Sequence, residues 1–525
     1  MDYAALLLRV IIDTSASWIR MFIALGISVL ISVLVGIYSA THQKAEKIIL
    51  PVVDVLQTLP ILAFFPVALA VFLVVLGTGL VGINAAIIFL IITSMLWNII
   101  LGVYESVKTI PLEFIELSEI YHFDRWTRLK KIYLPACMPR IIEQSILSWS
   151  IGLFYLVTSE IFSVGTSGHQ AAYGIGVAFA TYLAADGVAA YLIGIGVFIA
   201  FVVATRFLFF RPLENYSVRY MKSEARLPKH KYEIIALDWI SNKMPKTPTI
   251  LTMPLRGGVQ SHIRRRRHMA AASVVRGNSG RIYQLAALAI AVAALCLLFS
   301  NPVVRSYEVT VLPALLASFI RVWGAFAVML VIAIPLCVYL VFKTRRSSSY
   351  MLFFQIIASI PATILLPAIV VGLASYNLGP EVVAFVIFLL SGIWYIVFSI
   401  MASTRTISPG IFEVQKIFGV KGWNAWKNIY LKALLPGLIT GAMTGIAAEW
   451  NASIVAEYFV SGSVTSQVSL GIGKLLDISV GPTGQQIGGL ALMAVALLNL
   501  VVMILLVNTF VWKRLYKRVA KVYGG

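Results

Sequence analysis

Eleven apolar stretches, each close to the length that crosses a lipid bilayer, constrain the fold of this chain. A helix needs about 20 apolar residues to span a hydrocarbon core of roughly 30 Å. The stretches lie near residues 15–40, 48–76, 82–106, 137–164, 188–211, 282–300, 311–342, 350–374, 382–404, 434–460 and 485–511. Backbone groups must be paired in lipid, and the alternating segments of a β-barrel are not seen. The sequence therefore predicts an all-α polytopic membrane protein of about eleven transmembrane helices.

The second part of the chain repeats the first. The segment ELSEIYHFDRWTRLKKIYLP resembles EVQKIFGVKGWNAWKNIYLK, so that Glu116 falls on Glu413 and Trp126 on Trp423, 297 residues later. Earlier residues repeat at a shift of 301, and the repeat continues at 297 beyond these segments. Because both copies run in the same direction, we expect two homologous halves around an axis along the membrane normal, with a pathway between them.

A basic linker separates the halves. Residues 206–281 contain sixteen Lys and Arg against four acids, and several prolines interrupt them. A basic connector in a membrane protein is first a topology signal and a neighbour of anionic lipid, so nucleic-acid binding is the weaker interpretation. The sequence predicts a first half at 1–211, a cytoplasmic linker at 212–281 and a second half at 282–525. It also predicts a multi-pass protein of the cell membrane with an outside N-terminus, and with the repeated polar segments and the C-terminus in the cytoplasm.

No catalytic centre is visible in the sequence. A phosphate-binding Gly-x4-Gly-Lys-Ser/Thr loop, an HExxH motif, a CxxC pair and a nucleophile elbow are all missing. The six histidines are scattered, so we expect no metal site. Cys137, Cys296 and Cys337 lie in or beside apolar helices, and we expect them to be buried free thiols. The chain is predicted not to be an enzyme.

The repeated polar segment resembles the EAA loop of ABC importer permeases. That pattern has a Glu, a Gly six positions later and a hydrophobic-x-Leu-Pro end. The second copy has Glu413, Gly419 and Leu431, with Lys432 at the proline position. The first copy has Glu116, Leu134 and Pro135, with His122 at the glycine position. Since a left-handed conformation costs His more than Gly, we expect the turn to differ there.

The resemblance implies a role and partners for these segments. Two separate ATPase subunits, which bind ATP and magnesium, would dock on 113–134 and 411–432, and an external solute-binding protein would deliver the solute. This chain itself would carry no cofactor. Trp126 and Trp423 would anchor the segments in a pocket or at the membrane surface. The alternative is an ordinary amphipathic cytoplasmic loop.

A finer resemblance concerns the prolines of LQTLPILAFFP and IIASIPATILLP and the run AAEWNASIVAEYFVSG at 447–462. These residues are similar to the nitrate, sulfonate and taurine branch of the permeases, and to its fused, duplicated anion-transport members. The resemblance implies a small solute such as nitrate, a sulfonate, taurine or bicarbonate, and leaves a non-anionic solute open.

Candidate pathway residues align between the halves. Pro60 and Pro361 each remove a backbone donor inside a span, which produces either a packing kink or a helix break that lines a cavity. Glu160 and Glu457 align near the outer ends of their spans, where Arg20 and Arg321 are candidate partners. We favour a structural or gating ion pair over substrate contact. Asn451 and Ser453 complete the set of candidates. They lie deeper in the span, and as neutral hydrogen-bond donors they suit contact with an oxyanion.

The sequence favours the translocation pore of an ABC importer. The alternative is a secondary transporter driven by an ion gradient, which would place paired ionisable residues near the bilayer midplane. The aligned charges instead lie at span ends and in the polar segments. A membrane-embedded enzyme is disfavoured because no catalytic constellation is visible.

Overall fold

The computed structural model describes most of both halves. It covers residues 3–57, 59–77, 79–166, 173–185, 187–217, 302–340, 360–404, 417–461, 464–479 and 489–515, with isolated residues between 285 and 300, between 354 and 358 and at 518–519. The linker expected at 212–281 lies outside the described residues beyond Ser217.

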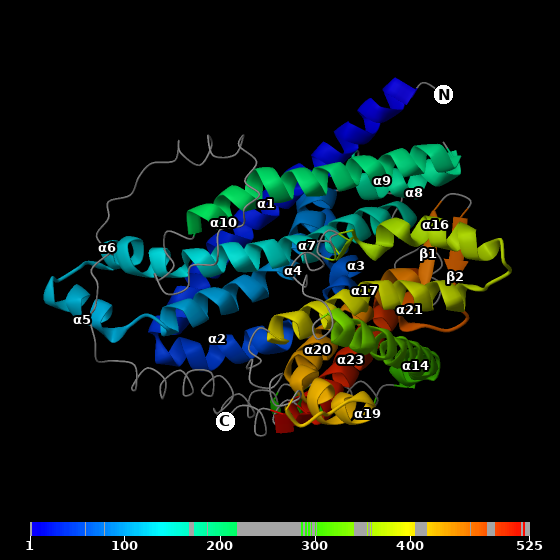
Figure 1. Ribbon diagram of the computed structural model, residues 1–525. Helices are drawn as coiled ribbons and strands as arrows, with labels where there is room; N and C mark the ends of the chain where they lie inside the picture. The colour runs from blue at the N-terminus through cyan, green and yellow to red at the C-terminus, as the bar shows by residue number, and fades with distance from the viewer. Residues whose placement is uncertain are drawn as a thin grey trace.

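Long apolar helices form the body of the protein (Figure 1). Those of the first half are α1 (Tyr3–Thr41), α4 (Leu80–Lys108), α7 (Leu134–Thr166) and α9 (Gly187–Ala204). Those of the second half are α14 (Pro302–Val338), α17 (Pro380–Thr404), α20 (Leu431–Ala456) and α23 (Gly489–Val507). Within the described residues, eight helices are long and apolar enough to cross a membrane. The expectation of an all-α polytopic membrane protein is confirmed.

Two expected spans differ from simple helices. The stretch 48–76 becomes α2 (Gln43–Leu56), a 3₁₀ turn (Ile61–Phe64) and α3 (Phe65–Leu76), with a bend of 88° at the break. The stretch 350–374 contains α16 (Ala362–Ala374), which is shorter than a full span. The stretch 282–300 lies mostly outside the described residues, so the count of eleven stays a prediction.

Close helix packing explains why the two halves can differ in sequence and keep one architecture. Small residues let membrane helices approach closely. In the first half, a Cβ on Gly102 of α4 would lie 2.6 Å from the Cγ of Gln144 on α7. At the equivalent contact of the second half, Ser399 of α17 faces Gly441 of α20, and a Cβ there would lie 3.0 Å from the Ser399 Cβ. The glycine of this contact lies on α4 in the first half and on α20 in the second half, and the close approach of the two helices is retained.

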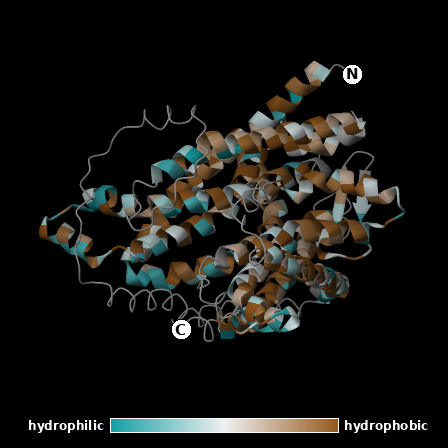
Figure 2. Ribbon diagram, in the orientation of Figure 1, coloured by the Kyte–Doolittle hydropathy of each residue, from teal (hydrophilic) through white to brown (hydrophobic). Residues whose placement is uncertain are grey.

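Short elements cover the two ends of the helices. In Figure 1, α5 (Leu112–Ile120) and α6 (Arg125–Arg128) lie at one end of the first-half helices, and α8 (Ile175–Ala185) lies at the other. By connectivity α19 (Gly422–Ala425) precedes α20, while strands β1 (Tyr458–Ser461) and β2 (Val464–Gln467) and helix α21 (Ile472–Ile478) follow it. Figure 2 shows hydrophilic residues on α2, α5, α6 and α10 (Arg211–Ser217), and apolar residues along the long helices.

Two local expectations are wrong. The antiparallel hairpin of β1 and β2, with Tyr458 opposite Gln467, has no counterpart among the predicted elements. Of the three cysteines, Cys137 and Cys337 are buried, but Cys296 is exposed, because apolar neighbours in sequence do not fix which face of a helix is covered. All three are free thiols.

Candidate functional site

The first polar segment is a short helical elbow at the start of a long helix. Helix α5 ends before His122, whose φ is +50°, and a second turn, α6, begins after Asp124. The Asp124 carboxylate accepts hydrogen bonds from the backbone N–H groups of Trp126 at 3.1 Å and Thr127 at 3.4 Å. A side-chain hydrogen bond from Thr127 is the main cause that lowers the pKa of Asp124. A π-helical turn, Leu129–Tyr133, then joins the elbow to α7.

The described part of the second polar segment, which begins at Ile417, has the same turn and the same connection to a long helix. Gly419 adopts φ +61°, α19 follows, and a π-helical turn at Trp426–Tyr430 leads into α20. His122 and Gly419 occupy equivalent positions, so the expectation that the turn differs at His122 is wrong. His122 adopts the left-handed conformation that the turn requires, at a conformational cost that Gly419 does not have. Glu413 lies outside the described residues.

Both segments present large apolar side chains to the surroundings. Ile120, Tyr121 and Trp126 in the first segment match Ile417, Phe418 and Trp423 in the second, and all six are between 61% and 77% exposed. Exposed apolar groups that gather on a polar element mark an interaction surface. We call these two sets the first and second apolar patches.

The remaining predicted residues of these segments border the patches. Glu116 is exposed on α5, whereas Leu134 and Leu431 are half-buried at the starts of α7 and α20. Pro135 is the second residue of α7, which continues directly from the π-helical turn, so this proline removes one N–H donor within a continuous helix. The Lys130 ammonium lies 4.7 Å from the centre of the Trp126 ring.

The prolines mark helix breaks where the two halves meet. Pro60 precedes the 3₁₀ turn at Ile61–Phe64, and Pro361 directly precedes α16. Of the two alternatives for these prolines, the structure has a break rather than a kink within a continuous helix. Broken backbone at membrane depth must find partners, and here the opposite half supplies them.

Three hydrogen bonds cross between the halves at these breaks. The Leu62 N–H donates to Asn451 Oδ1 on α20 at 3.2 Å. On the other side, Thr158 of α7 donates to the Thr363 hydroxyl at 3.3 Å, and the Tyr191 hydroxyl donates to the Ile364 carbonyl. Each half therefore satisfies polar groups of the other near the expected pathway.

The two predicted neutral donors are engaged within their own helix. The Asn451 amide donates to the Ala447 carbonyl at 2.9 Å, and the Ser453 hydroxyl donates to the Trp450 carbonyl at 2.9 Å. Both side chains are buried. Their role as donors to an oxyanion stays a prediction.

A buried ion pair lies near the C-terminal end of α7, at the opposite end of this helix from the first polar segment. Arg20 Nη1 lies 2.6 Å from Glu160 Oε1, and the Glu160 carboxylate is fully buried. The same carboxylate accepts hydrogen bonds from the Ser17 hydroxyl at 2.8 Å and from the Gly176 N–H at 2.8 Å. Arg20 Nη2 also donates to the Tyr173 carbonyl at 2.6 Å.

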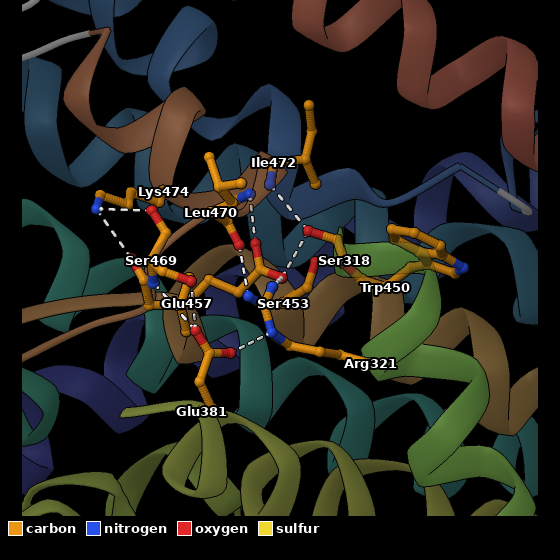
Figure 3. Close-up of polar contacts among 12 residues, drawn as sticks. Ser318, Arg321, Glu381, Trp450, Ser453, Glu457, Ser469, Leu470, Ile472 and Lys474 are labelled. Atoms are coloured by element: carbon orange, nitrogen blue, oxygen red, sulfur yellow. Dashed lines mark hydrogen bonds and ion pairs between the residues drawn. The ribbon is translucent and has the colours of Figure 1, made fainter. Parts of the chain in front are cut away.

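The second half repeats these contacts of the carboxylate and the arginine (Figure 3). Arg321 Nη1 lies 3.1 Å from Glu457 Oε1, which also accepts from the Ser318 hydroxyl at 2.6 Å. The Gly473 N–H donates to Glu457 Oε2 at 2.8 Å, and Arg321 Nη2 donates to the Leu470 carbonyl at 2.5 Å. The structure thus joins both predicted pairs. Their role in gating stays a prediction.

The glycines beside these carboxylates have a steric function. A Cβ on Gly174 would lie 2.8 Å from the carboxyl carbon of Glu160, and one on Gly471 would lie 2.3 Å from Glu457 Oε2. Only glycine lets the backbone come this close. Gly174 aligns with Gly471 and Ser17 with Ser318 in the repeat, but neither alignment predicted that these residues would contact the glutamates.

Two of the buried acids that were not predicted are Glu449 and Asp477. Glu449 on α20 is fully buried, and neither of its oxygens has a hydrogen-bond partner among the described residues. Asp477 on α21 is 3% exposed and its Oδ1 also lacks a partner within that part of the chain. Burial raises the pKa of Asp477 well above its usual value.

The sequence matches known membrane transport proteins. It is 24% identical over 156 residues to the bicarbonate transport system permease protein CmpB of Synechococcus elongatus, over 30% of this chain and 53% of the relative. It is 27% identical over 143 residues to the nitrate import permease protein NrtB of Leptolyngbya laminosa, over 27% of this chain and 45% of the relative. It is 26% identical over 184 residues to the glycine betaine/proline betaine transport system permease protein ProW of Salmonella typhimurium, over 34% and 49%. The chain spans about half the length of these relatives.

A protein family accounts for both halves. The family described as "Binding-protein-dependent transport system inner membrane component" matches residues 32–211 and again 332–519. The two matches take in more than half of the sequence and contain both ion-pair glutamates and both polar segments. The chain therefore belongs to this family, as a duplicated, multi-pass ABC importer permease of the inner membrane.

Proposed function

We propose that this single chain forms the complete translocation pathway of an ABC importer and binds two ATPase subunits through its two apolar patches. The observation that carries the proposal is the match between the patches. Equivalent large apolar side chains are exposed on two elbows of the same shape, where a membrane protein without a partner would bury them or replace them with polar groups. The ATPases would bind ATP and magnesium, and this chain would hold no cofactor.

The elbows connect directly to the contacts between the halves. Each elbow continues through a π-helical turn into one long helix, α7 or α20. Helix α20 has 26 residues and is therefore about 39 Å long. It carries Asn451, which contacts the first half, and it leads to Glu457 at its far end. A force applied to an elbow would reach the contacts between the halves along one rigid element.

The direction of the cycle follows from this connection. Closure of the ATPases would pull the two elbows together and rock the halves, which would separate α7 and α20 from the opposite breaks at Pro361 and Pro60. In this proposal the elbows, the linker and the C-terminus are cytoplasmic and the N-terminus is outside. The basic residues of the linker support that orientation.

For the solute we propose a small anion such as nitrate, a sulfonate, taurine or bicarbonate, delivered by an external solute-binding protein. The names of two relatives, a bicarbonate and a nitrate permease, support an anion, whereas the betaine permease keeps a zwitterion open. Neutral groups supply the polar contacts between the halves at the two proline breaks, at Leu62, Thr158 and Ile364, whereas the ion pair of Lys513 with Asp54 also joins the halves. A pathway of neutral donors suits a small solute that must bind weakly and pass.

The docking claim has a direct test. The chain, purified in detergent, is titrated with a candidate ATPase subunit of a binding-protein-dependent importer, and binding is followed by interferometry. Replacing both Trp126 and Trp423 with Ala should lower the affinity of each site at least about thirtyfold, because a central aromatic anchor carries about 2 kcal/mol or more. Leu34→Ala is the matched control, since Leu34 is 58% exposed on α1, away from the elbows. Unchanged affinity in the double tryptophan variant would refute docking through the patches.

A further inference from the structure

The two outer clusters differ first in the partner of the arginine Nε. In the first half, Arg20 Nε donates to the Asn84 amide oxygen at 2.7 Å. In the second half, Arg321 Nε donates to the Glu381 carboxylate at 2.5 Å. Asn84 and Glu381 lie 297 positions apart, in the first turns of α4 and α17. A neutral contact in one half is therefore an ionic contact in the other.

Glu381 also binds the chain that follows the hairpin. Its Oε1 accepts hydrogen bonds from the Ser469 N–H at 3.0 Å and from the Ser469 hydroxyl at 2.9 Å (Figure 3). We call residues 464–473 the second outer segment and residues 173–176, its described equivalent, the first outer segment. The residue equivalent to Ser469 is Ala172, which has no hydroxyl. The second outer segment is thus bonded to three long helices, α14, α17 and α20.

The first half places its second acid differently. Asp13 accepts from the Gly174 N–H at 3.4 Å, and it lies on α1, the helix that already carries Ser17 and Arg20. The equivalent of Asp13 in the second half is Ala314. Both clusters therefore contain one arginine and two acids. In the first half the second acid, Asp13, lies on α1, which already contributes to the cluster. In the second half the second acid, Glu381, brings a further helix, α17, into the cluster.

We propose that Glu381 is a positioning residue that fastens the second outer segment to α17, so that the first outer segment is the one that moves when the pathway opens at this face. Charge-assisted hydrogen bonds are shorter and stronger than neutral ones, and Glu381 makes three of them to two partners. Lys474 strengthens the segment itself by donating to the Val468 carbonyl at 2.9 Å. The valine at the equivalent position, Val177, cannot do so.

The partial exposure of Glu381 makes this connection a moderate one. Its side chain is 46% exposed, and solvent screens such contacts. The buried pair of Arg321 and Glu457 would keep the cluster folded when Glu381 is removed. Loss of Glu381 is thus expected to loosen one segment and to leave the rest of the bundle intact.

Hydrogen exchange on the full chain in nanodiscs tests the proposal without any ATPase, so its outcome is independent of the proposed docking. After correction for intrinsic rates, the amides of Ser469 and Leu470 should exchange about tenfold more slowly than that of Tyr173. Glu381→Asn, which copies the first half, should abolish this difference by accelerating the second outer segment, with the first unchanged. Equal rates in the unmodified protein, or acceleration of both segments by Glu381→Asn, would overturn the proposal.

Two further variants keep the test decisive if Glu381→Asn does not fold. Glu381→Gln keeps the shape and one acceptor oxygen, and Ser469→Ala removes only the hydroxyl contact. Each should accelerate exchange at residues 469–470 about threefold without a change at Tyr173. Exchange that stays within the measurement error in both variants would refute a positioning role for Glu381.

Discussion

Arg20 and Glu160 are separated by 140 positions in the sequence, and their charged atoms lie 2.6 Å apart near the C-terminal end of α7. Arg321 and Glu457 repeat the pair in the second half. Each carboxylate is fully buried and also accepts a serine hydroxyl and a glycine N–H. The clusters therefore fix where the chain that follows α7 and α20 turns back.

Removing only the cation of this pair should be costly. Arg20→Met leaves the Glu160 carboxylate buried without its counter-ion, and we expect a loss of about 3–5 kcal/mol of unfolding free energy. Replacing both residues with Met should cost less, because no buried charge is left. Unfolding in mixed micelles measures both variants. A double variant that is as unstable as the single one, or less stable, would contradict this account of the pair.

The left-handed turn of the second elbow should require glycine. Gly419 has φ +61° and no atom within 4 Å of a Cβ placed on it, so the cost of Gly419→Ala is conformational. We expect a loss of about 1 kcal/mol. Gly26→Ala is the control, since Gly26 lies within α1 with equally open space around it. Comparable stability of the two variants would show that the turn tolerates a side chain, as it does at His122.

The buried carboxyl of Asp477 should make stability depend on pH. Burial raises its pKa in the folded protein, so the folded state binds more protons than the unfolded one. The stability that this provides is complete below the unfolded pKa of about 4 and is lost as the pH rises through the raised folded pKa. Asp477→Asn should flatten that slope in unfolding curves recorded between pH 4 and pH 8. An unchanged slope would mean that Asp477 is not the group responsible.

The unpartnered acid of α20 distinguishes the two transport classes. Glu449 is equivalent to Gly152, where a Cβ would lie 2.2 Å from the Met95 Cε, and the equivalent of Met95 is Gly392. The larger residue of this helix contact is thus Met95 on α4 in the first half and Glu449 on α20 in the second half, which favours a packing role for Glu449. Glu449→Met should raise the unfolding free energy by about 1–3 kcal/mol, because an unpaired polar group is removed from the interior.

The same variant should retain ATP-driven uptake. A variant that is more stable but transports nothing would instead favour an ion-coupled mechanism, since secondary transporters use ionisable residues within the membrane. Glu449→Gln, with nearly the same shape, separates the two effects.

The long helices and the ion pairs could be predicted because their signals are local or repeated. Hydropathy over twenty residues fixes a span wherever it lies, and the alignment of Glu160 with Glu457 gave each a partner in an aligned arginine. The turn at His122 could not be predicted, because its φ is set by the elements on both sides and not by the preference of one residue. The hydrogen bond from Leu62 to Asn451 depends on how two halves pack, and no periodicity in either half contains that information.

Uptake by the purified chain in proteoliposomes, together with a candidate ATPase and a candidate solute-binding protein, tests the central claim most directly. The account predicts that nitrate or bicarbonate accumulates against its gradient only when Mg-ATP is present on the ATPase side, and that ionophores which collapse ion gradients leave uptake unchanged. Accumulation by the chain alone, driven by an imposed ion gradient with no ATPase present, would contradict it.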